Sequence, residues 1–426
     1  MTSYRAAWVV PIDRAPIQDG ILDVDGGRII GVREPGAGSR EPGAGSREPG
    51  AGSREPGTGT REPGGITDLG EVALLPGLIN AHTHLELSWL RGRVPPASKF
   101  TDWVKTLFAI RGRPDSAMTT SQIAAIHDAI AEARAAGTAA VGDISNSLAS
   151  VEPLRRAGVD GVVFHELLGF TERDGSLIER TRFLRESALA SGARVSLAPH
   201  APYSTSLELF RAIRAAVDEQ ACPIMSVHLG ESQEEVEFLE KGSGPWRRML
   251  ELIGAWRDDW TVPHCDPVTY LERAGVIDAR TLIVHGVQLT DAALARLASI
   301  GATVVACPRS NAWVGVGYPP VERFYRSGVQ VAVGTDSLAS VDDLNVFAEL
   351  KAMRWLAPGV AAATLLESAT LSGARALGLA AELGSLTTGK RASVIAVALT
   401  GRVADIEEYL VSGINPSQIS WLKAES

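Results

Sequence analysis

The chain alternates between short apolar runs and longer amphipathic segments over most of its length. Eight runs have the length and composition of buried strands, and they lie at 74–81, 139–144, 161–165, 195–199, 224–228, 282–285, 303–307 and 329–334. The segments between them carry the apolar spacing of helices, for example at 121–136, 206–219, 291–300 and 344–356. Apolar strands that alternate with helices are typical of a (β/α)8 barrel, because its strands are covered on both faces. We therefore expect an α/β fold with a TIM barrel over residues 74–378.

Both ends of the chain have a different pattern. Residues 4–10 and 20–31 alternate like short strands around the turn sequence Asp25-Gly26-Gly27, and residues 390–398 read as another strand. We expect residues 1–73 and 379–426 to form one small β-sandwich domain from both termini.

A repeat interrupts the N-terminal part of this domain. Arg-Glu-Pro-Gly begins at residue 33 and returns at 40, 47 and 54, with a degenerate copy at 61. No position of the seven-residue period is apolar enough for a coiled-coil seam, and every copy carries Pro and Gly. We expect residues 33–65 to be a flexible loop without a function of its own, and a binding role is the alternative.

Composition narrows the classes of function. The 426 residues carry 45% hydrophobic and 21% charged residues, enough for a large core, and the net charge is −9 without a long basic block. We therefore expect no nucleic-acid partner. No apolar stretch reaches 18 residues and the N-terminus does not resemble a signal peptide, so we expect no membrane association and a cytoplasmic location. The three cysteines form no CxxC pair, which fits a reducing compartment and argues against a thiolate metal site.

Polar residues gather where the apolar runs end. Six of the eight histidines follow this rule, as do three carboxylates: His82, His84, His165, His200, His228, His285, Asp143, Glu166 and Asp336. In a barrel, the carboxyl ends of all strands meet on one face, where active sites are built. The sequence therefore predicts an active site at this face.

Four of these residues suit a metal ion. His82 and His84 are spaced i and i+2, so their side chains point to the same side of a strand. With His228 and Asp336 they offer three neutral imidazoles and one carboxylate, a ligand set for a divalent first-row metal that keeps a position open for water. We expect one ion, Zn²⁺ with Fe²⁺ as the alternative. A helix cap before Leu344 is the other interpretation of Asp336.

Two further residues suit proton transfer beside such an ion. Glu231 follows His228 by three residues, and a carboxyl next to an activated water performs general acid/base work. The alternative for Glu231 is the first turn of an acidic helix at 231–240, where the helix dipole favours a negative charge. For His285 three interpretations stay open: orienting the water, acting as a fifth metal ligand, or filling the core. We expect Glu231, His285 and Asp336 to be the catalytic residues.

Six motifs together resemble the amidohydrolase superfamily, in its branch of deaminases and chlorohydrolases. In chain order they are Pro-Gly-Leu-Ile-Asn-Ala-His-Thr-His, Ala-Pro-His-Ala-Pro-Tyr-Ser, Val-His-Leu-Gly-Glu, Val-His-Gly, Cys-Pro-Arg-Ser-Asn and Gly-Thr-Asp-Ser. The resemblance implies a metal-dependent barrel with a sandwich from both termini. It also implies the metal ligands His82, His84, His228 and Asp336. It assigns Glu231 to proton transfer, His285 to the metal-bound water and His200 to the substrate. The Arg-Glu-Pro-Gly repeat departs from the family pattern.

Within this branch, stretches such as His-Leu-Glu-Leu-Ser and Val-Gly-Asp-Ile-Ser-Asn-Ser are most similar to the aminodeoxyfutalosine deaminases of menaquinone biosynthesis. The resemblance implies hydrolysis of 6-aminodeoxyfutalosine to futalosine and ammonia, with a purine nucleoside as the partner. A methylthioadenosine/S-adenosylhomocysteine or guanine deaminase and a triazine chlorohydrolase are alternatives, and a homodimer stays open. Besides His200, we expect Glu86 and Ser145 to bind substrate and Arg309 to meet its carboxylate. A structural arginine at the barrel mouth is the alternative for Arg309.

Overall fold

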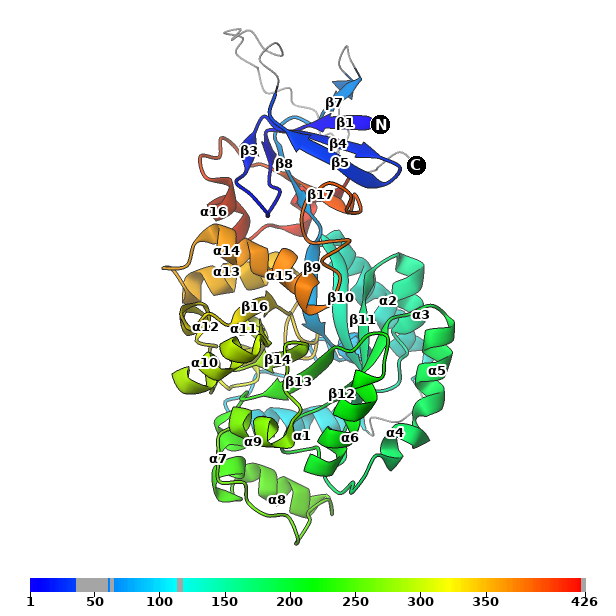
Figure 1. The fold of residues 1–426 in the computed structure, drawn as a ribbon, viewed down its shortest axis with the longest axis vertical. Coiled ribbons are helices and arrows are strands. Elements are labelled where there is room, and N and C mark those ends of the chain that lie inside the picture. The colour runs from blue at the N-terminus through cyan, green and yellow to red at the C-terminus, as the bar shows by residue number, and fades with distance from the viewer. Residues whose placement is uncertain (36–59, 62–64, 113–117, 423–426) are drawn as a thin grey trace.

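The computed structural model describes residues 1–35, 60–61, 65–112 and 118–422 (Figure 1). Most of the predicted repeat loop at 33–65 lies outside these residues.

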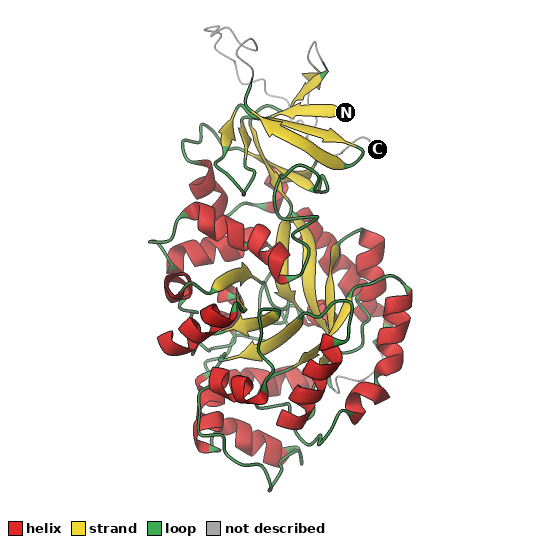
Figure 2. Cartoon of the chain, viewed as in Figure 1, coloured by secondary structure: helices red, strands yellow, loops and turns green. Residues whose placement is uncertain are grey.

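Eight parallel strands form the centre of the larger part of the molecule (Figure 2). They make two four-stranded sheets, with the orders β12-β11-β10-β9 and β13-β14-β15-β16. In chain order the strands are β9 (Leu78–Thr83), β10 (Thr138–Ser145), β11 (Asp160–Leu167), β12 (Val195–Pro199), β13 (Met225–Leu229), β14 (Thr281–His285), β15 (Thr303–Ala306) and β16 (Gln330–Val333). Each strand overlaps one predicted apolar run, which confirms the α/β class with parallel strands.

The two sheets meet at the carboxyl ends of their outer strands. On one side Thr83 and Asp336 form an isolated parallel bridge, and on the other the amide of His228 donates to the carbonyl of His200 over 2.9 Å. Within the described residues, the strand ladder itself does not run continuously around all eight strands. The ends of both sheets are nevertheless held against each other where the polar residues lie.

The first predicted run, 74–81, belongs to two different sheets. Its first part is β8 (Val72–Pro76), which pairs with a C-terminal strand, and its second part is β9. Gly77 separates them. A glycine is required here, because a Cβ at this residue would lie 2.7 Å from Cβ of Ala139 and 2.8 Å from the ring of Trp421. The sheets therefore change at Gly77, a few residues after the predicted boundary at 73/74.

Helices follow most of the parallel strands and cover their outer faces (Figure 2). The α-helices of the first half are α1 (Phe100–Arg111), α2 (Thr120–Ala135), α3 (Val151–Ala157), α4 (Ser176–Arg180), α5 (Arg182–Ala190), α6 (Leu207–Asp218), α7 (Gln233–Lys241) and α8 (Pro245–Leu252). Those of the second half are α9 (Pro267–Ala274), α10 (Asp291–Ile300), α11 (Pro308–Trp313), α12 (Val321–Ser327), α13 (Val346–Leu356), α14 (Ala362–Ser368), α15 (Leu371–Ala376) and α16 (Ile406–Val411). Two 3-10 helices, η1 (Leu85–Leu90) and η2 (Pro416–Gln418), complete the described helices. The four helices given as examples from sequence are confirmed by α2, α6, α10 and α13, with boundaries that differ by at most two residues.

Strands from both ends of the chain form two further sheets, with the orders β5-β4-β1-β7-β6 and β18-β17-β8-β2-β3. They lie together at one end of the molecule, above the parallel strands in Figure 1. Their remaining strands are β1 (Thr2–Arg5), β2 (Trp8–Val9), β3 (Ile17–Gln18), β4 (Ile21–Asp25), β5 (Arg28–Arg33), β6 (Thr60–Arg61), β7 (Ile66–Asp68), β17 (Val394–Ala398) and β18 (Ile419–Trp421). Gly26 and Gly27 have positive φ angles of 52° and 73° between β4 and β5, as a tight hairpin turn with right-handed strand twist requires.

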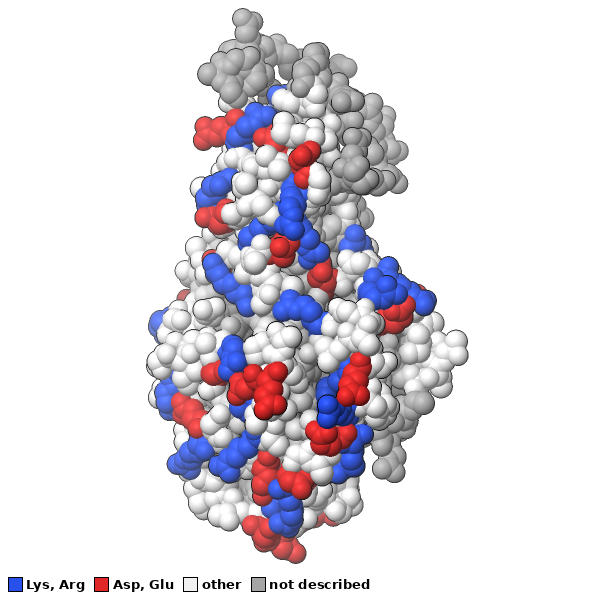
Figure 3. All heavy atoms as spheres, turned by 45° about the vertical axis from the view of Figure 1, so that its right-hand side comes forward, with Lys and Arg blue, Asp and Glu red and all other residues white. Residues whose placement is uncertain are grey.

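The distribution of charge on the surface and the length and polarity of the helices fit the composition of the chain. On the face shown in Figure 3, acidic and basic side chains lie intermingled. Within the described ranges, every helix is too short or too polar to cross a bilayer.

Candidate active site

Four histidines and an aspartate form one buried cluster at the carboxyl ends of the parallel strands. The ring centroids of His82 and His84 are 4.9 Å apart, and that of His228 lies 5.0 Å from His82 and 5.4 Å from His84. An oxygen of Asp336 lies 3.8 Å from Nε2 of His82 and 3.5 Å from Nε2 of His84. The ring of His285 lies 5.7 Å from His82. The four predicted ligands thus lie together, with His285 as their neighbour.

The donor atoms in this cluster suit a divalent metal ion. Two sets of three have ligand atoms within 4.8 Å of one another, His82 with His84 and Asp336, and His82 with His228 and His285. His82 is completely buried, yet neither of its ring nitrogens has a hydrogen-bond partner. Buried polar atoms almost always have a partner, and a metal ion bound by the cluster would supply one. Burial lowers the pKa of all four histidines, which keeps them in the neutral form that binds metal.

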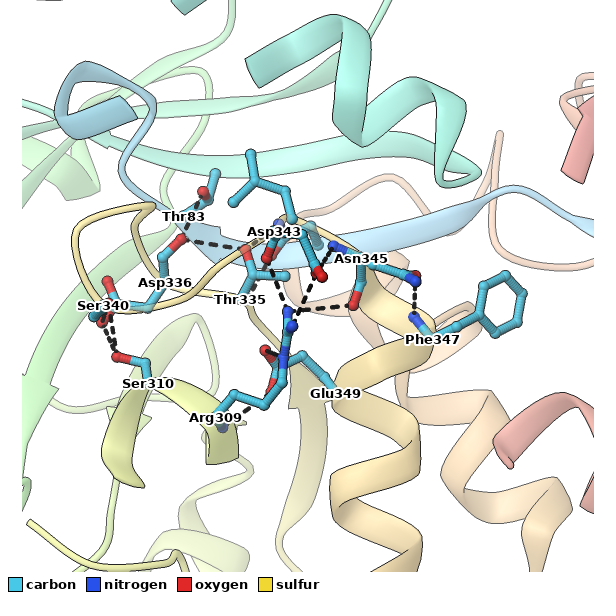
Figure 4. A network of polar contacts seen from close by, with 12 residues as sticks. Thr83, Arg309, Ser310, Thr335, Asp336, Ser340, Asp343, Asn345, Phe347 and Glu349 are labelled. Atoms are coloured by element: carbon cyan, nitrogen blue, oxygen red, sulfur yellow. Dashed lines mark hydrogen bonds and ion pairs between the residues drawn. The ribbon is translucent and has the colours of Figure 1, made fainter. Parts of the chain in front are cut away.

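Asp336 is held in place from several sides (Figure 4). Its backbone amide donates to the carbonyl of His82 over 3.0 Å, and its carbonyl accepts from the hydroxyl of Thr83 over 2.9 Å. The hydroxyls of Ser310 and Ser340 both donate to the carboxylate oxygen Oδ2. This leaves Oδ1 facing the histidines. Burial raises the pKa of Asp336 to about 6, and the two serine hydrogen bonds act against that rise.

Close packing between β9 and the end of β16 explains the motifs on these two segments. The side chain of Asn80 donates to Thr335 Oγ1 over 2.8 Å and accepts from the backbone amide of Thr335 over 3.1 Å. Gly334 is required next to this pair, because a Cβ there would lie 2.8 Å from both Cβ and the carbonyl oxygen of His82. The Asn-Ala-His-Thr-His and Gly-Thr-Asp-Ser motifs therefore fit one another as a pair.

Two residues of the cluster have unusual backbone conformations. His285 and Asp336 have φ angles of 75° and 61°, in the left-handed region that residues with a Cβ rarely adopt. Such strain persists only where surrounding contacts impose it, and it concentrates at functional sites. Asp336 is also not a helix cap, since α13 is capped by Asn345.

Glu231 lies beside the histidines and not in a helix. Gly230, with a φ of 62°, turns the chain out of β13, and α7 begins only at Gln233, with Ser232 as its N-cap. Glu231 is 3% exposed, and its Oε1 lies 3.5 Å from Nε2 of His285. Burial raises its pKa well above the usual value, and nearby Asp336 and Glu235 raise it further. The carboxyl of Glu231 therefore binds a proton far more strongly than an exposed one does.

A cavity of about 330 Å³ opens onto this centre. His84, His228, His285, Glu231 and Asp336 contribute to its lining. His200 and Ser204 line it as well, and Nδ1 of His200 lies 2.6 Å from the hydroxyl of Ser204. The remaining lining is mostly apolar and comes largely from α1, α8 and the segment after β11: Leu87, Phe100, Trp103, Val104, Leu107, Phe108, Arg111, Glu166, Leu168, Gly169, Phe170, Thr171, Tyr203, Trp246, Met249, Leu250, Ile253, Ala255, Val314 and Ser337.

Two polar residues at strand ends do not face the cavity. His165 is buried on the opposite side of β11 from Glu166, as strand alternation requires, and its Nδ1 accepts a hydrogen bond from Nη1 of Arg185 over 3.0 Å. The carboxylate of Asp143 accepts from the amide of Leu85 over 2.8 Å and from the hydroxyl of Ser150. The expectation that all these strand-end residues meet at one site is therefore wrong for His165 and Asp143.

Glu86 and Ser145 contact one another and not the cavity. The carboxylate of Glu86 accepts hydrogen bonds from the hydroxyl of Ser145 and from the amides of Asn146, Ser147 and Ala149. Neither Glu86 nor Ser145 is among the lining residues. The predicted substrate contacts are corrected accordingly: Glu86 and Ser145 organise the loop after β10.

Arg309 is also not among the lining residues, and it points toward Asp343 and Glu349 (Figure 4). Its Nε donates to Glu349 over 2.7 Å, its Nη1 to the carboxylate of Asp343 over 2.8 Å, and its Nη2 to the carbonyl of Asp343 over 2.9 Å. Glu349 is completely buried, so this pair is part of the packing between α11 and α13. The prediction that Arg309 meets a substrate carboxylate is wrong, and the structural alternative describes its contacts.

Two charged lining residues were given no role from the sequence, although Glu166 was expected at this face. Glu166 lies in the cavity wall, with Oε1 3.6 Å from Nδ1 of His228 and without a hydrogen-bond partner. Arg111 is the last residue of α1. The helical spacing of Phe100, Trp103 and Leu107 places Arg111 on the same face as these apolar residues, a signal that was present in the sequence.

The chain is similar to several known deaminases. The aminodeoxyfutalosine deaminase of Deinococcus radiodurans is 32% identical over 320 residues, which cover 72% of this chain and 73% of that protein. A 5-methylthioadenosine/S-adenosylhomocysteine deaminase of Bacillus cereus is 29% identical over 351 residues, covering 78% of this chain and 74% of that protein. The crystal structure of an adenosine deaminase from Xanthomonas campestris with bound zinc has a TM-score of 0.78 and 26% identity, and the match covers 98% of this chain and 90% of that chain. The sequence profile of the amidohydrolase family matches residues 73–419, a range that includes the whole histidine cluster, and the chain therefore belongs to the amidohydrolase family.

Proposed function

We propose that this amidohydrolase is a hydrolytic deaminase that removes the 6-amino group of an adenine-type nucleoside. The observation that carries the proposal is the buried Glu231, whose carboxyl has a strongly raised pKa and lies beside the neutral histidine cluster at the head of a large cavity. The deaminases named among the relatives support the reaction class. Among the substrates they name, 6-aminodeoxyfutalosine is our first choice, with futalosine and ammonia as the products.

His82, His84, His228 and Asp336 would hold one divalent ion, Zn²⁺ in preference to Fe²⁺. The two unpartnered ring nitrogens of His82 and the neutral state of the imidazoles fit such an ion. When bound, the ion lowers the pKa of a coordinated water to about 7 and so supplies a nucleophile at neutral pH.

Glu231 moves the protons of the reaction. Its carboxyl protonates the purine nitrogen next to the carbon that bears the amine while the oxygen of water adds to that carbon. The first proton of the water passes through Glu231 to the amine, the carbon–nitrogen bond breaks, and ammonia leaves. The second proton, from the hydroxyl now on that carbon, returns to Glu231 as the ring carbonyl forms, which restores the protonated carboxyl. His285, 3.5 Å from Glu231, and Asp336 hold the attacking water in place.

The cavity fits a substrate of nucleoside size, since small-molecule sites enclose roughly 300–1,000 Å³. His200 lines the cavity next to His228, with their ring centroids 4.9 Å apart, and is placed to contact the substrate close to the reacting carbon.

We further infer that the two parallel sheets form one (β/α)8 barrel and that the terminal sheets form a sandwich. One buried hydrophobic cluster combines Ile79 and Phe164 of one parallel sheet with Val284 of the other. Another combines Tyr4 of one terminal sheet with Val394 of the other. Shared clusters of this kind are what closed and face-to-face packed sheets produce.

A substrate panel tests the function. The zinc-loaded protein is incubated with 6-aminodeoxyfutalosine, methylthioadenosine, S-adenosylhomocysteine, adenosine, guanine and a chlorotriazine, and the release of ammonia and of chloride is measured. We expect ammonia from the adenine nucleosides, with the highest kcat/KM for 6-aminodeoxyfutalosine. Chloride release from the triazine without deamination of any nucleoside would overturn the proposal, and a preference for methylthioadenosine would replace only the named substrate.

A further inference from the structure

Arg111 is a cation in the cavity wall, and in the described part of the chain its guanidinium makes no close ion pair, although the charges of Glu166 and Glu86 act on it from a longer distance. Its Nη2 donates to Oδ1 of Asn146 over 2.7 Å, and no carboxylate oxygen in the described part of the chain lies within 4.0 Å of its guanidinium. Arg309, by contrast, contacts two carboxylates. Withdrawing a cation from water is unfavourable unless an anion or hydrogen bonds replace the water, so the guanidinium of Arg111 favours an anion from outside the chain.

The neighbours of Arg111 define its position relative to the reacting centre. Asn146 is oriented by its own amide, whose Nδ2 donates to the carbonyl of Glu166 over 3.1 Å and to the carboxylate oxygen Oε2 over 3.2 Å. The other oxygen of Glu166, Oε1, lies 3.6 Å from Nδ1 of His228. The contacts therefore run from Arg111 through Asn146 and Glu166 to His228. Arg111 is thus linked to the histidine cluster through two side chains and lines the same cavity, so it can bind a part of the ligand other than the reacting base.

Aromatic side chains line another part of the same cavity. Phe100 contacts Trp246 edge to face with ring centroids 5.7 Å apart, and Trp246 stacks on Tyr203 at 3.8 Å. Trp103 stacks beside Phe100 at 6.2 Å. Walls of this kind favour an aromatic or other apolar group on the ligand.

We propose that Arg111 binds a carboxylate on the ribose substituent of the substrate, so that the enzyme prefers adenine nucleosides whose substituent is an aryl carboxylate. This inference rests on the proposed deaminase function. The guanidinium holds both carboxylate oxygens, while the unpartnered Oε1 of Glu166 accepts a hydrogen bond from a ribose hydroxyl.

The test compares 6-aminodeoxyfutalosine with its methyl ester, which keeps the shape and removes the charge. KM and kcat are measured for both compounds with the parent and with Arg111→Met. The control is Arg155→Met, which removes an exposed arginine whose partner is Glu152 on α3. The parent and the control should show a KM at least about tenfold lower for the acid than for the ester, as one charge-assisted bidentate contact produces. Arg111→Met should show nearly equal KM values and an unchanged metal content.

The outcomes separate this inference from the proposed function. An unchanged preference for the acid in Arg111→Met, or no preference in the parent, would overturn the role of Arg111 while deamination stands. If Arg111→Met does not fold, Arg111→Lys replaces it and should show an intermediate preference, because lysine keeps the charge but loses the two parallel hydrogen bonds. Calorimetric binding of the product futalosine to the same proteins needs no turnover. Arg111-dependent binding without any deamination would reject the proposed function alone.

Discussion

Burial has opposite effects on the acids and the bases of the centre. It lowers the pKa of His82, His84, His228 and His285, and it raises the pKa of Glu231. The free chain therefore combines imidazoles that stay uncharged near neutral pH with a carboxyl that binds its proton more strongly than usual. This combination suits metal binding and proton donation at the same place.

Glu231→Gln tests the proton shuttle. Glutamine keeps the size and the hydrogen-bonding capacity of the side chain but cannot donate and accept a proton in turn, so we expect kcat to fall by at least about 10²-fold. Metal content should equal that of the parent, because Glu231 is not among the four proposed ligands. Glu240→Gln, at an exposed position of α7, is the matched control and should retain full activity. Activity of Glu231→Gln within a few-fold of the parent would mean that another group carries the proton.

His165 should make the stability of the fold depend on pH. Burial, and after it the nearby charge of Arg185, lowers its pKa from 6.5 to about 4. The neutral Nδ1 accepts the hydrogen bond from Arg185. The unfolded chain then binds a proton more readily than the folded chain below pH 6.5. His165 therefore contributes stability that is present above pH 6.5 and is lost as the pH falls toward 4.

His165→Gln keeps a hydrogen-bond acceptor and removes the titration. Between pH 7 and pH 4 the parent should lose roughly 3 kcal/mol more unfolding free energy than the variant. Urea unfolding of both metal-free proteins at several pH values measures the difference. Parallel stability curves would show that His165 titrates normally in the fold.

At the level of elements, the site depends on how closely the end of β16 approaches β9. Hydrogen bonds between Asn80 and Thr335 hold the two segments at a fixed separation, and Gly334 has no room for a side chain against His82. The position of one histidine is thus set by a residue that is far from it in sequence.

Gly334→Ala should disturb both stability and metal binding. The added methyl group meets the Cβ and carbonyl of His82 at 2.8 Å, so we expect a loss of about 1–3 kcal/mol in unfolding free energy and a reduced zinc content. Gly31→Ala in β5 is the control, because a Cβ there has nothing within 4 Å. Denaturant unfolding and metal analysis check both variants, and full zinc occupancy in Gly334→Ala would show that β9 can shift without cost to the site.

At the scale of the whole molecule, Trp421 connects the terminal strands to the parallel sheet. Its Nε1 donates to the carbonyl of Arg134 at the end of α2 over 2.8 Å, the guanidinium of Arg134 lies 4.6 Å from the centre of its ring, and the same ring faces Gly77 where β8 passes into β9. Strands from the end of the chain therefore support β9, the strand that carries His82 and leads into His84.

Trp421→Ala should destabilise the protein without removing the metal ligands. We expect a loss of about 2–4 kcal/mol, since the residue loses a partly buried aromatic contact and a hydrogen bond. Phe183→Ala, at an aromatic side chain that is 65% exposed, should change stability little. Thermal unfolding with zinc analysis distinguishes the two, and equal effects would mean that the terminal strands do not support the sheet.

The sequence by itself determined the strands and the side-chain directions that depend on a short stretch of the chain. The apolar runs predicted eight parallel strands, and the spacing of His82 and His84 placed both imidazoles on one side of β9. Gly230 and Glu231 directly follow β13, so their place beside His228 was also evident from the sequence. Such predictions hold because strand alternation and the common direction of parallel strands operate over a few residues.

Only the tertiary structure decided which charged side chains face the cavity. Arg309 follows a predicted strand, but it packs against Glu349 of α13, about 40 residues later in the chain, whereas Arg111 at the end of α1 lines the cavity and donates a hydrogen bond to Asn146. Glu86 likewise contacts the loop after β10, and His165 contacts α5. The direction of a long charged side chain follows from the partner that satisfies it, and that partner comes from a distant segment whose position only the folded chain defines.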